Sequence, residues 1–412
     1  MARNTKNNNA RRDTPLKGSN LSTVRGTNER LILHLVRTHK QLTKAQATQI
    51  TGLSANAVSV IFRALEAEGY LLRCEPIRGR IGQPSTPVRL NPEARSFLGL
   101  HIGRRSYRLA VVDFAGNVLS SVTKLHTHPT PQNLLAFATE SVPALLSQAS
   151  LELGQIDGFN VAAPNELWSW QAEFGSGQAN LDVWRSFDIQ GEIAALFQLP
   201  VLIENDATAA CRAEQVFGGR RDARDWAYFF IDSFIGGGVV LNGSVFPGRR
   251  GHAGGFGPLR VPNQTGGDRL MDHASLLTLE KMLPDQSESK IARLYNEPSD
   301  WSPIQNAVDA WIKRAGESLA YGFVSTLAVI DFEEFVIDGT MPRAVLERLI
   351  EEAKTQLLQR DLQGIELPTI RAGQFGHIAG ALGAAGIQIS NEFMIDQNKL
   401  LQDNHTIVSS TL

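Results

Sequence analysis

The sequence has 412 residues, with a formal net charge of −2. This length is sufficient for two or three domains with sizeable cores. The two cysteines, Cys74 and Cys211, are too few for a disulfide framework or a cysteine zinc site. The N-terminus lacks the apolar stretch of a secretory signal, and the longest apolar run, at 321–330, is too short to cross a bilayer. We therefore expect a soluble, cytoplasmic protein with no membrane partner.

The charge is distributed unevenly along the chain. Residues 1–90 hold 15 of the 40 Lys and Arg residues but only 5 of the 42 Asp and Glu residues. A basic first part before an acidic remainder is expected when only the first part contacts nucleic-acid phosphates. Residues 1–20 are polar and basic with few apolar groups, which indicates a disordered arm that adds phosphate contacts.

Three helices are predicted within residues 21–90. Apolar residues recur with helical spacing over 28–38. Thr43 and Gln46 have capping-box spacing at the start of a helix over 44–50. Ser54 is a typical N-cap for the next helix, whose apolar stripe comprises Val58, Ile61, Phe62 and Leu65. This is the layout of a helix-turn-helix with its recognition helix second, although an ordinary helical hairpin would give the same pattern.

The recognition helix and the segment after it supply the candidate DNA contacts. The polar face of this helix carries side chains that can reach base edges in a major groove, namely Asn56, Ser59, Val60 and Arg63. A strand from Leu71 leads to a basic hairpin tip rich in Gly and Pro, where Arg78, Arg80 and Gln83 would form a wing on the backbone or in a minor groove. The alternative is a solvated loop without a ligand. We predict a winged helix-turn-helix domain over residues 21–90.

Strands and helices alternate after residue 90. Strands are predicted at 97–112, 117–123, 156–163, 201–203, 226–231 and 335–337, and helices at 133–153, 207–216, 308–330 and 378–388. This alternation predicts an α/β body with a largely parallel sheet. Residues 233–238 are predicted as a glycine-rich turn, and Asn242-Gly243 as the turn of a β-hairpin. Small residues in the last helix permit close packing without any ligand.

Several motifs follow one another in a fixed order. After the GRIGQPS wing come Asn180-Leu181-x-x-Trp184, Glu204-Asn205-Asp206-Ala207, Ile235-Gly236-Gly237-Gly238 and the run GHAGGFG at 251–257. In these segments the chain resembles the repressor branch of the ROK family of sugar kinases and transcriptional regulators. The resemblance implies a multidomain protein, in which a two-lobed α/β actin-like ATPase (ribonuclease H-like) domain over 91–412 follows the winged helix-turn-helix. Its C-terminal helix would return to the first lobe, and a sugar site would lie between the lobes.

The resemblance also implies roles for single residues. In the family's kinases the aspartate matching Asp206 is the general base toward the sugar hydroxyl, and the asparagine matching Asn205 holds the sugar. Asn180 and Asp272 complete the effector-binding residues that the resemblance suggests. Asn205 and Asp206 could instead merely cap the helix that follows them.

Four positions depart from the family's kinases. His101 replaces an aspartate of the first phosphate loop, and Phe234 replaces a glycine that leaves room for the nucleotide. Gly255 and Pro258 occupy the positions of a sugar-binding Glu and of a His that is also a zinc ligand in many members. Residues 265–272 lack the accompanying cysteines, so we expect no metal site and no cofactor.

These features predict a sequence-specific DNA-binding regulator, a repressor of carbohydrate-related genes, with no enzymatic activity. It would bind a palindromic operator in double-stranded DNA as a homodimer or tetramer, with a sugar or sugar derivative as candidate effector. One alternative is an ATP-dependent sugar kinase with an accessory DNA-binding head. Another is a regulator whose body is a dimerisation scaffold without a ligand.

Overall fold

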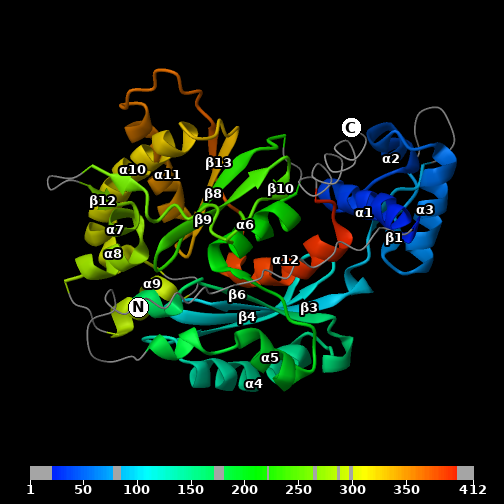
Figure 1. Ribbon diagram of the computed structural model, residues 1–412, viewed down its shortest axis with the longest axis horizontal. Helices are drawn as coiled ribbons and strands as arrows, with labels where there is room; N and C mark the ends of the chain where they lie inside the picture. Colours follow the sequence, from blue (N-terminus) through cyan, green and yellow to red (C-terminus); the bar gives the residue numbers. More distant parts are fainter. Residues whose placement is uncertain are drawn as a thin grey trace, which may run out of the picture.

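The computed structural model describes residues 21–77, 85–170, 181–219, 222–262, 267–284, 288–296 and 300–396. A small N-terminal part lies at one side of a larger body, whose two sheets lie one above the other (Figure 1). We call residues 21–90 the head and the rest of the described chain the body. The division at residue 90 remains a prediction.

The head contains the predicted helices and a two-stranded sheet. Its elements are α1 (Leu21–His39), α2 (Lys44–Thr51), α3 (Ala55–Ala67), β1 (Leu71–Arg73) and β2 (Val88–Leu90). The Thr43 hydroxyl accepts a hydrogen bond from the Gln46 backbone N–H at 3.2 Å, and the Gln46 side chain accepts one from the Thr43 N–H at 2.9 Å. Gly52 ends α2 with a φ of 69°, a left-handed value that glycine adopts without strain. The predicted capping box and the turn between α2 and α3 are confirmed.

The head sheet extends beyond its two named strands. Leu42 forms an antiparallel bridge with Val88, and Ile77 forms one with Ser85. The second bridge continues the antiparallel pairing of β1 and β2 as far as Ile77 and Ser85. The predicted wing residues Arg78, Arg80 and Gln83 lie outside the described residues.

Each lobe of the body is built on a five-stranded mixed sheet. The first has the order β5-β4-β3-β6-β7, and the second has the order β10-β9-β8-β13-β14. The strands of the first are β3 (Ser96–Ile102), β4 (Ser106–Asp113), β5 (Val118–Leu125), β6 (Gly158–Ala163) and β7 (Ile203–Asn205). Those of the second are β8 (Trp226–Ile231), β9 (Ile235–Leu241), β10 (Ser244–Val245), β13 (Glu334–Gly339) and β14 (Thr369–Ala372).

The expectation of a largely parallel sheet is wrong. In the first sheet β5, β4 and β3 pair antiparallel, whereas β3, β6 and β7 pair parallel, and the second sheet repeats this division. Short turns cause the antiparallel halves, because a strand that returns through a few residues can pair only antiparallel with its predecessor. One of these turns, at Gly103–Arg105, divides the single strand predicted over 97–112.

The glycine-rich turn predicted over 233–238 is also corrected. Gly236, Gly237 and Gly238 lie inside β9. A Cβ added to Gly238 would lie 2.4 Å from the Cβ of Cys211 on the helix α6 (Asp206–Phe217). These glycines therefore permit close helix packing. The predicted Asn242-Gly243 hairpin turn is confirmed, with φ values of 53° and 76°.

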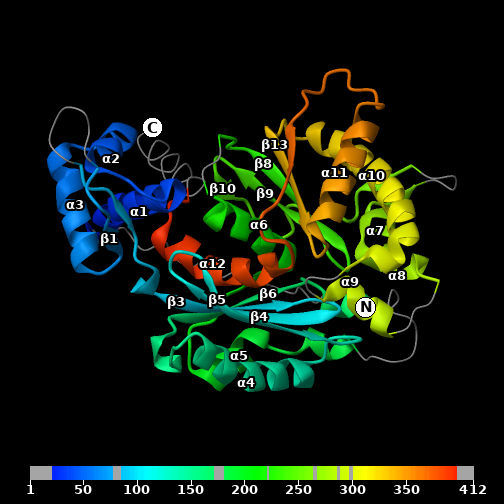
Figure 2. The same ribbon diagram turned by 180° about the vertical axis from the view of Figure 1, so that it is seen from behind.

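Helices cover both faces of the two sheets. In Figures 1 and 2, α4 (Pro131–Gln148) and α5 (Ile189–Phe197) lie on the outer face of the first sheet, while α6 and α12 (Ala379–Phe393) lie between the sheets. The second sheet is covered on its other face by further helices: α7 (Met271–Ala274), α8 (Leu276–Met282), α9 (Glu288–Tyr295), α10 (Gln305–Leu327) and α11 (Arg343–Leu357). None of the helices in the described ranges has the length and apolar character needed to span a bilayer.

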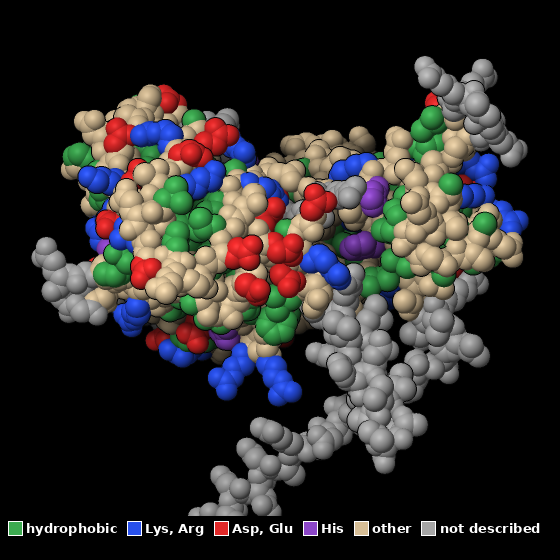
Figure 3. Space-filling model, turned by 90° about the horizontal axis from the view of Figure 1, so that it is seen from above, with side chains coloured by type: hydrophobic (Ala, Val, Ile, Leu, Met, Phe, Trp, Pro, Cys, Tyr) green, Lys and Arg blue, Asp and Glu red, His purple; other side chains and the backbone are tan. Residues whose placement is uncertain are grey.

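Charge on the molecular surface follows the sequence asymmetry. Figure 3 shows acidic side chains gathered in the middle of one face of the body and Lys and Arg side chains at the outer edge of the head. The head therefore presents the surface better suited to a polyanion.

The head and the first lobe share one hydrophobic cluster. It includes Val58 and Phe62 of α3, Phe114 after β4, Phe217 of α6 and Ile389 of α12. This continuity joins the head to the body through buried apolar contacts and not through a flexible linker.

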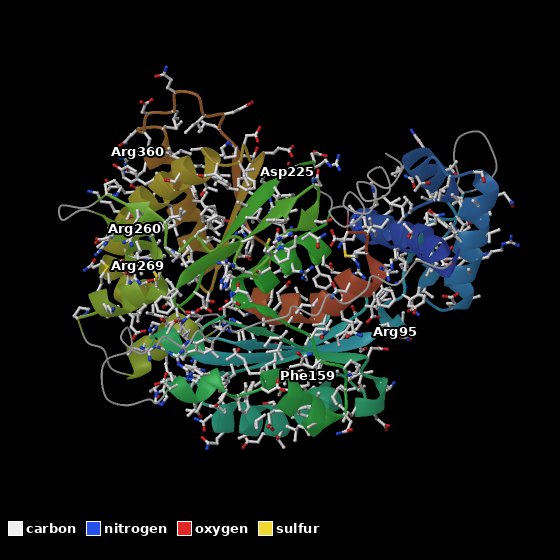
Figure 4. All side chains as sticks on the ribbon, in the orientation of Figure 1. Arg95, Phe159, Asp225, Arg260, Arg269 and Arg360 are labelled. Atoms are coloured by element: carbon white, nitrogen blue, oxygen red, sulfur yellow. The ribbon has the colours of Figure 1, made fainter. Side chains whose placement is uncertain are left out.

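Polar and aromatic contacts reinforce this junction. The buried Arg37 of α1 donates a hydrogen bond to the Phe114 carbonyl at 2.7 Å, and its guanidinium carbon lies 5.0 Å from the centre of the Phe114 ring. The Tyr70 and Phe393 ring centres are 5.4 Å apart. Arg95 lies where the head meets the first sheet (Figure 4), with its guanidinium 5.3 Å from the Tyr70 ring centre.

We expect Phe114→Ala to destabilise the protein by about 3–5 kcal/mol, because it removes a fully buried ring at the junction. Urea unfolding of the whole chain measures this loss. Phe246→Ala is the matched control, since Phe246 is 41% exposed and its loss should stay within about 0.5 kcal/mol. Equal effects of the two substitutions would contradict a shared core.

Candidate functional site

A cavity of about 320 Å³ lies between the two lobes. The first lobe contributes the β3–β4 turn at Gly103 and Arg104 and the segment 164–166 after β6. The second lobe contributes the β8–β9 connection and the loop 251–258. We call this space the cleft cavity. Because both lobes line it, a ligand held there would contact both of them.

Asn205 and Asp206 line the cleft cavity at the start of α6. The Asn205 side-chain oxygen accepts hydrogen bonds from the backbone N–H groups of Ala207 at 3.2 Å and Thr208 at 3.1 Å, so Asn205 is the N-cap. The Asp206 carboxylate accepts from the Ala207 N–H at 2.9 Å. Both residues therefore cap α6, as the alternative interpretation of this motif expected, and both also face the cleft cavity.

Arg104 occupies the space beside Asp206. Its guanidinium lies 3.8 Å from the Asp206 carboxylate, and its central carbon lies 4.3 Å from the centre of the Phe234 ring. Phe234 is 7% exposed. A cation and an aromatic ring thus lie together at the wall of the cleft cavity.

His101 is fully buried at the end of β3. Burial, together with the Arg108 cation, lowers the pKa of the His101 imidazole, which is therefore neutral near pH 7. A Cβ added to Gly380 of α12 would lie 2.7 Å from its ring, so the imidazole packs directly against that helix. A neutral ring in this place cannot take over the charge of a magnesium-coordinating carboxylate.

Arg108 is buried beside His101 and reaches the second lobe. Its guanidinium lies 3.6 Å from the Asp232 carboxylate and donates a hydrogen bond to the Tyr295 carbonyl at 3.2 Å. Arg105 pairs with Glu280 of α8 in the same way. Arginines of the first lobe therefore tie the two lobes together beside the cleft cavity.

Three further lining residues have no side chain that forms hydrogen bonds. Gly255, Pro258 and Met271 all face the cleft cavity. Asp272 lies in a neighbouring cavity, where its carboxylate pairs with Arg269 at 2.7 Å. Partial burial would raise the pKa of Asp272, but the bonds from Arg269 outweigh this effect and lower it. Figure 4 shows Arg269 at the side of the body far from the head.

The structure thus brings together only two of the four predicted effector residues, Asn205 and Asp206. Asn180 lies outside the described residues. Sequence reasoning missed Arg104 and Met271 as lining residues. Over the described ranges, no group of three or more His, Cys, Asp or Glu side chains could hold a metal ion.

Buried histidines predict a loss of stability in acid. Burial is the main cause that lowers the pKa of His34 and His377 to about 4 and of His126 to about 3, and it also lowers that of His101. Below pH 6.5 the unfolded chain takes up protons that the folded chain does not bind. The free energy of unfolding therefore decreases as the pH is lowered. Each histidine contributes up to about 1.4 kcal/mol per pH unit. Burial raises the pKa of Asp338 to about 6. Below pH 6 the folded chain therefore protonates this carboxyl before the unfolded chain does, which stabilises the fold, but one carboxyl opposes four histidines.

Urea unfolding at pH 7 and pH 5 tests this prediction. We expect a smaller free energy of unfolding at pH 5, and a weaker pH dependence for His126→Asn than for the unchanged protein. A free energy that is the same at both pH values would show that these histidines are not buried as neutral groups.

Comparison with known proteins identifies the architecture. The model of the ROK family matches residues 97–390. A xylose repressor from Bacillus subtilis is 23% identical, over 89% of this chain and 96% of that protein. A crystal structure of a ROK family transcriptional regulator, described as a homologue of the E. coli MLC protein, covers 90% of this chain and 97% of its own, with a TM-score of 0.60 and 18% identity.

A kinase structure covers a smaller share of the chain. The ROK family glucokinase from Streptomyces griseus, solved with glucose and AMPPNP, has a TM-score of 0.52 and 22% identity, over 70% of this chain and 98% of its own. At these identities the solved structures show the fold alone. The chain belongs to the ROK family, and its N-terminal helices precede the two mixed α/β sheets of that family's actin-like ATPase fold.

Proposed function

We propose that this protein is a sequence-specific DNA-binding transcriptional regulator, a repressor of carbohydrate-related genes, whose body has no kinase activity. The observation that carries this proposal is the head, in which α3 buries an apolar stripe and leaves its polar face exposed. The similarity to a xylose repressor over nearly the whole of that protein supports the same function.

The exposed face of α3 has the chemistry for base recognition. Asn56, Val60 and Arg63 are exposed, and Ser59 is half-buried. Arginine suits guanine, asparagine suits adenine, and an apolar side chain such as that of Val60 suits the thymine methyl group. The hairpin beyond Ile77 would carry the wing. Two heads in a dimer or tetramer would read a palindromic operator, and such a regulator acts in the cytoplasm.

The cleft cavity is the proposed effector site. Asn205 and Asp206 offer hydrogen-bond acceptors and an amide, which suit the hydroxyl groups of a sugar or sugar derivative. Gly255, Pro258 and Met271 supply no hydrogen bonds from their side chains, so the selectivity of this site would differ from that of a hexose kinase.

Two helices connect this cavity to the head. α6 begins at Asp206 in the cleft cavity and ends at Phe217, whose ring centre lies 5.6 Å from the Arg37 guanidinium. α12 begins near the His101 ring and ends at Phe393 against Tyr70. An effector that binds one arrangement of the lobes more tightly would therefore shift the head with it.

We expect Arg63→Ala to weaken specific binding by about 1–3 kcal/mol and to relax base preference at one position, because it removes a base contact. The measurement is selection of genomic fragments by the purified full-length protein at physiological ionic strength, followed by titration of the selected duplex. Arg343→Ala on α11 removes the same charge from the body and should leave binding unchanged. Equal selection by both variants would place the DNA surface elsewhere.

A sugar kinase is the second candidate function, because Asp206 faces the cleft cavity as a general base would. His101, Phe234 and the Arg104 cation beside Asp206 oppose it. We expect no ATP-dependent sugar phosphorylation in a coupled assay with magnesium and a panel of hexoses. Turnover that Asp206→Asn abolishes, and that Asp182→Asn on the exposed surface does not, would establish the kinase instead.

A further inference from the structure

A second cavity of about 540 Å³ opens beside the cleft cavity. The two cavities share four lining residues, Pro164, Asn165, Asn205 and Gly251. The two cavities are therefore adjacent, with these four residues between them. Together they have the size of a site for a small molecule with more than one ring.

The second cavity adds aromatic and aliphatic side chains to polar ones. Its apolar lining includes Leu167, Trp168, Trp184, Phe187, Ile189 and Ile203, and Arg185, Glu204 and Thr208 line it as well. Ile203 is 44% exposed and Trp168 is half-buried, so apolar surface is open to a ligand. The cleft cavity presents the polar groups of Asn205, Asp206 and Arg104. The indole of Trp168 beside these groups suits a molecule in which a hydroxylated ring is joined to a second ring that stacks on the indole.

The aromatic wall is held in place before any ligand binds. The Trp184 indole N–H donates a hydrogen bond to the Pro129 carbonyl at 3.1 Å, and its ring packs edge-on against Phe187 with centres 5.5 Å apart. The Arg185 guanidinium lies 5.2 Å from the Trp168 ring centre and pairs with Asp182 at 2.9 Å. Fixed side chains reduce the entropy lost when a ring stacks on them.

The passage between the cavities is crossed by a contact between the lobes. Asn165 of the first lobe donates a hydrogen bond from its amide to the Gly251 carbonyl of the second lobe at 3.1 Å, and the same amide lies 3.0 Å from a ring nitrogen of His252. A ligand that fills both cavities would lie against this contact. It would therefore act on the relative position of the lobes as well as on affinity.

We propose that the two cavities form one site for a two-ring glycoside. Its sugar ring lies in the cleft cavity against Asn205 and Asp206, and its second ring lies against Trp168. In either case the ligand is a pyranose linked through its glycosidic oxygen to a second ring that can stack on an indole, and this second ring is either another sugar or an aryl group. This inference rests on the proposed function, because it specifies the class of effector that the body senses.

Calorimetric titration of the full-length protein with glucose, maltose, cellobiose and 4-nitrophenyl glucoside tests it. We expect at least one two-ring probe to bind about tenfold tighter than glucose or more. Trp168→Ala should abolish that preference and leave the affinity for glucose within about twofold, whereas Trp168→Phe should retain most of it. Leu196→Ala is the control, because it removes an exposed apolar side chain on α5, outside both cavities.

Each outcome decides the inference. A preference shown by the disaccharides identifies the second ring as a sugar, and one shown only by the nitrophenyl probe identifies it as an aryl aglycone. Equal affinities for one-ring and two-ring probes, or an equal loss of both in Trp168→Ala, would overturn it. Absence of any binding would also overturn it, and fragment selection by the same preparation would then show separately whether the DNA-binding proposal stands.

Discussion

The body depends on the close approach of α12 to β3 and α6. A Cβ added to Gly99 of β3 would lie 2.0 Å from the Ala381 carbonyl, and one added to Gly383 of α12 would lie 1.7 Å from the Ala209 carbonyl of α6. Backbone therefore packs directly on backbone between the two sheets, and even one methyl group at these positions would displace it. Because helices in contact through backbone cannot tilt independently, α6 and α12 must move as one unit.

The packed pair of α6 and α12 connects the cleft to the head. α6 begins at the cleft cavity, α12 begins beside the His101 ring, and both end in the cluster that the head shares with the first lobe. The buried Arg37 makes this junction specific, because its guanidinium needs the Phe114 carbonyl as an acceptor, and a shifted head would leave it buried and unpaired. A packed junction of this kind favours two discrete positions of the head over a continuous range.

Local signals in the sequence predicted the elements whose causes are local. Thr43, Gln46 and Ser54 place the helices of the head, and Asn242-Gly243 places a hairpin, because capping and turn chemistry involve neighbours in the chain. The turn between β3 and β4, which divides the strand predicted over 97–112, and the helix α11 were not predicted. The apolar positions of α11, including Leu346, Leu349 and Ile350, do recur with helical spacing, so that signal was present but not used.

The site was predictable only where a motif fixes a residue on a rigid element. Asn205 ends β7, Asp206 follows it, and both lie in the cleft as expected, whereas Asp272 lines only the neighbouring cavity although the adjacent Met271 lines both. A shift of one residue along a helix turns a side chain by about 100°, so an alignment without structural context cannot separate them. Arg104 could not be placed from sequence either, since its position depends on Asp206 and Phe234, which are more than a hundred residues away. The same argument applies to the second cavity, whose wall joins segments on both sides of α5 and becomes a single surface only in the folded chain.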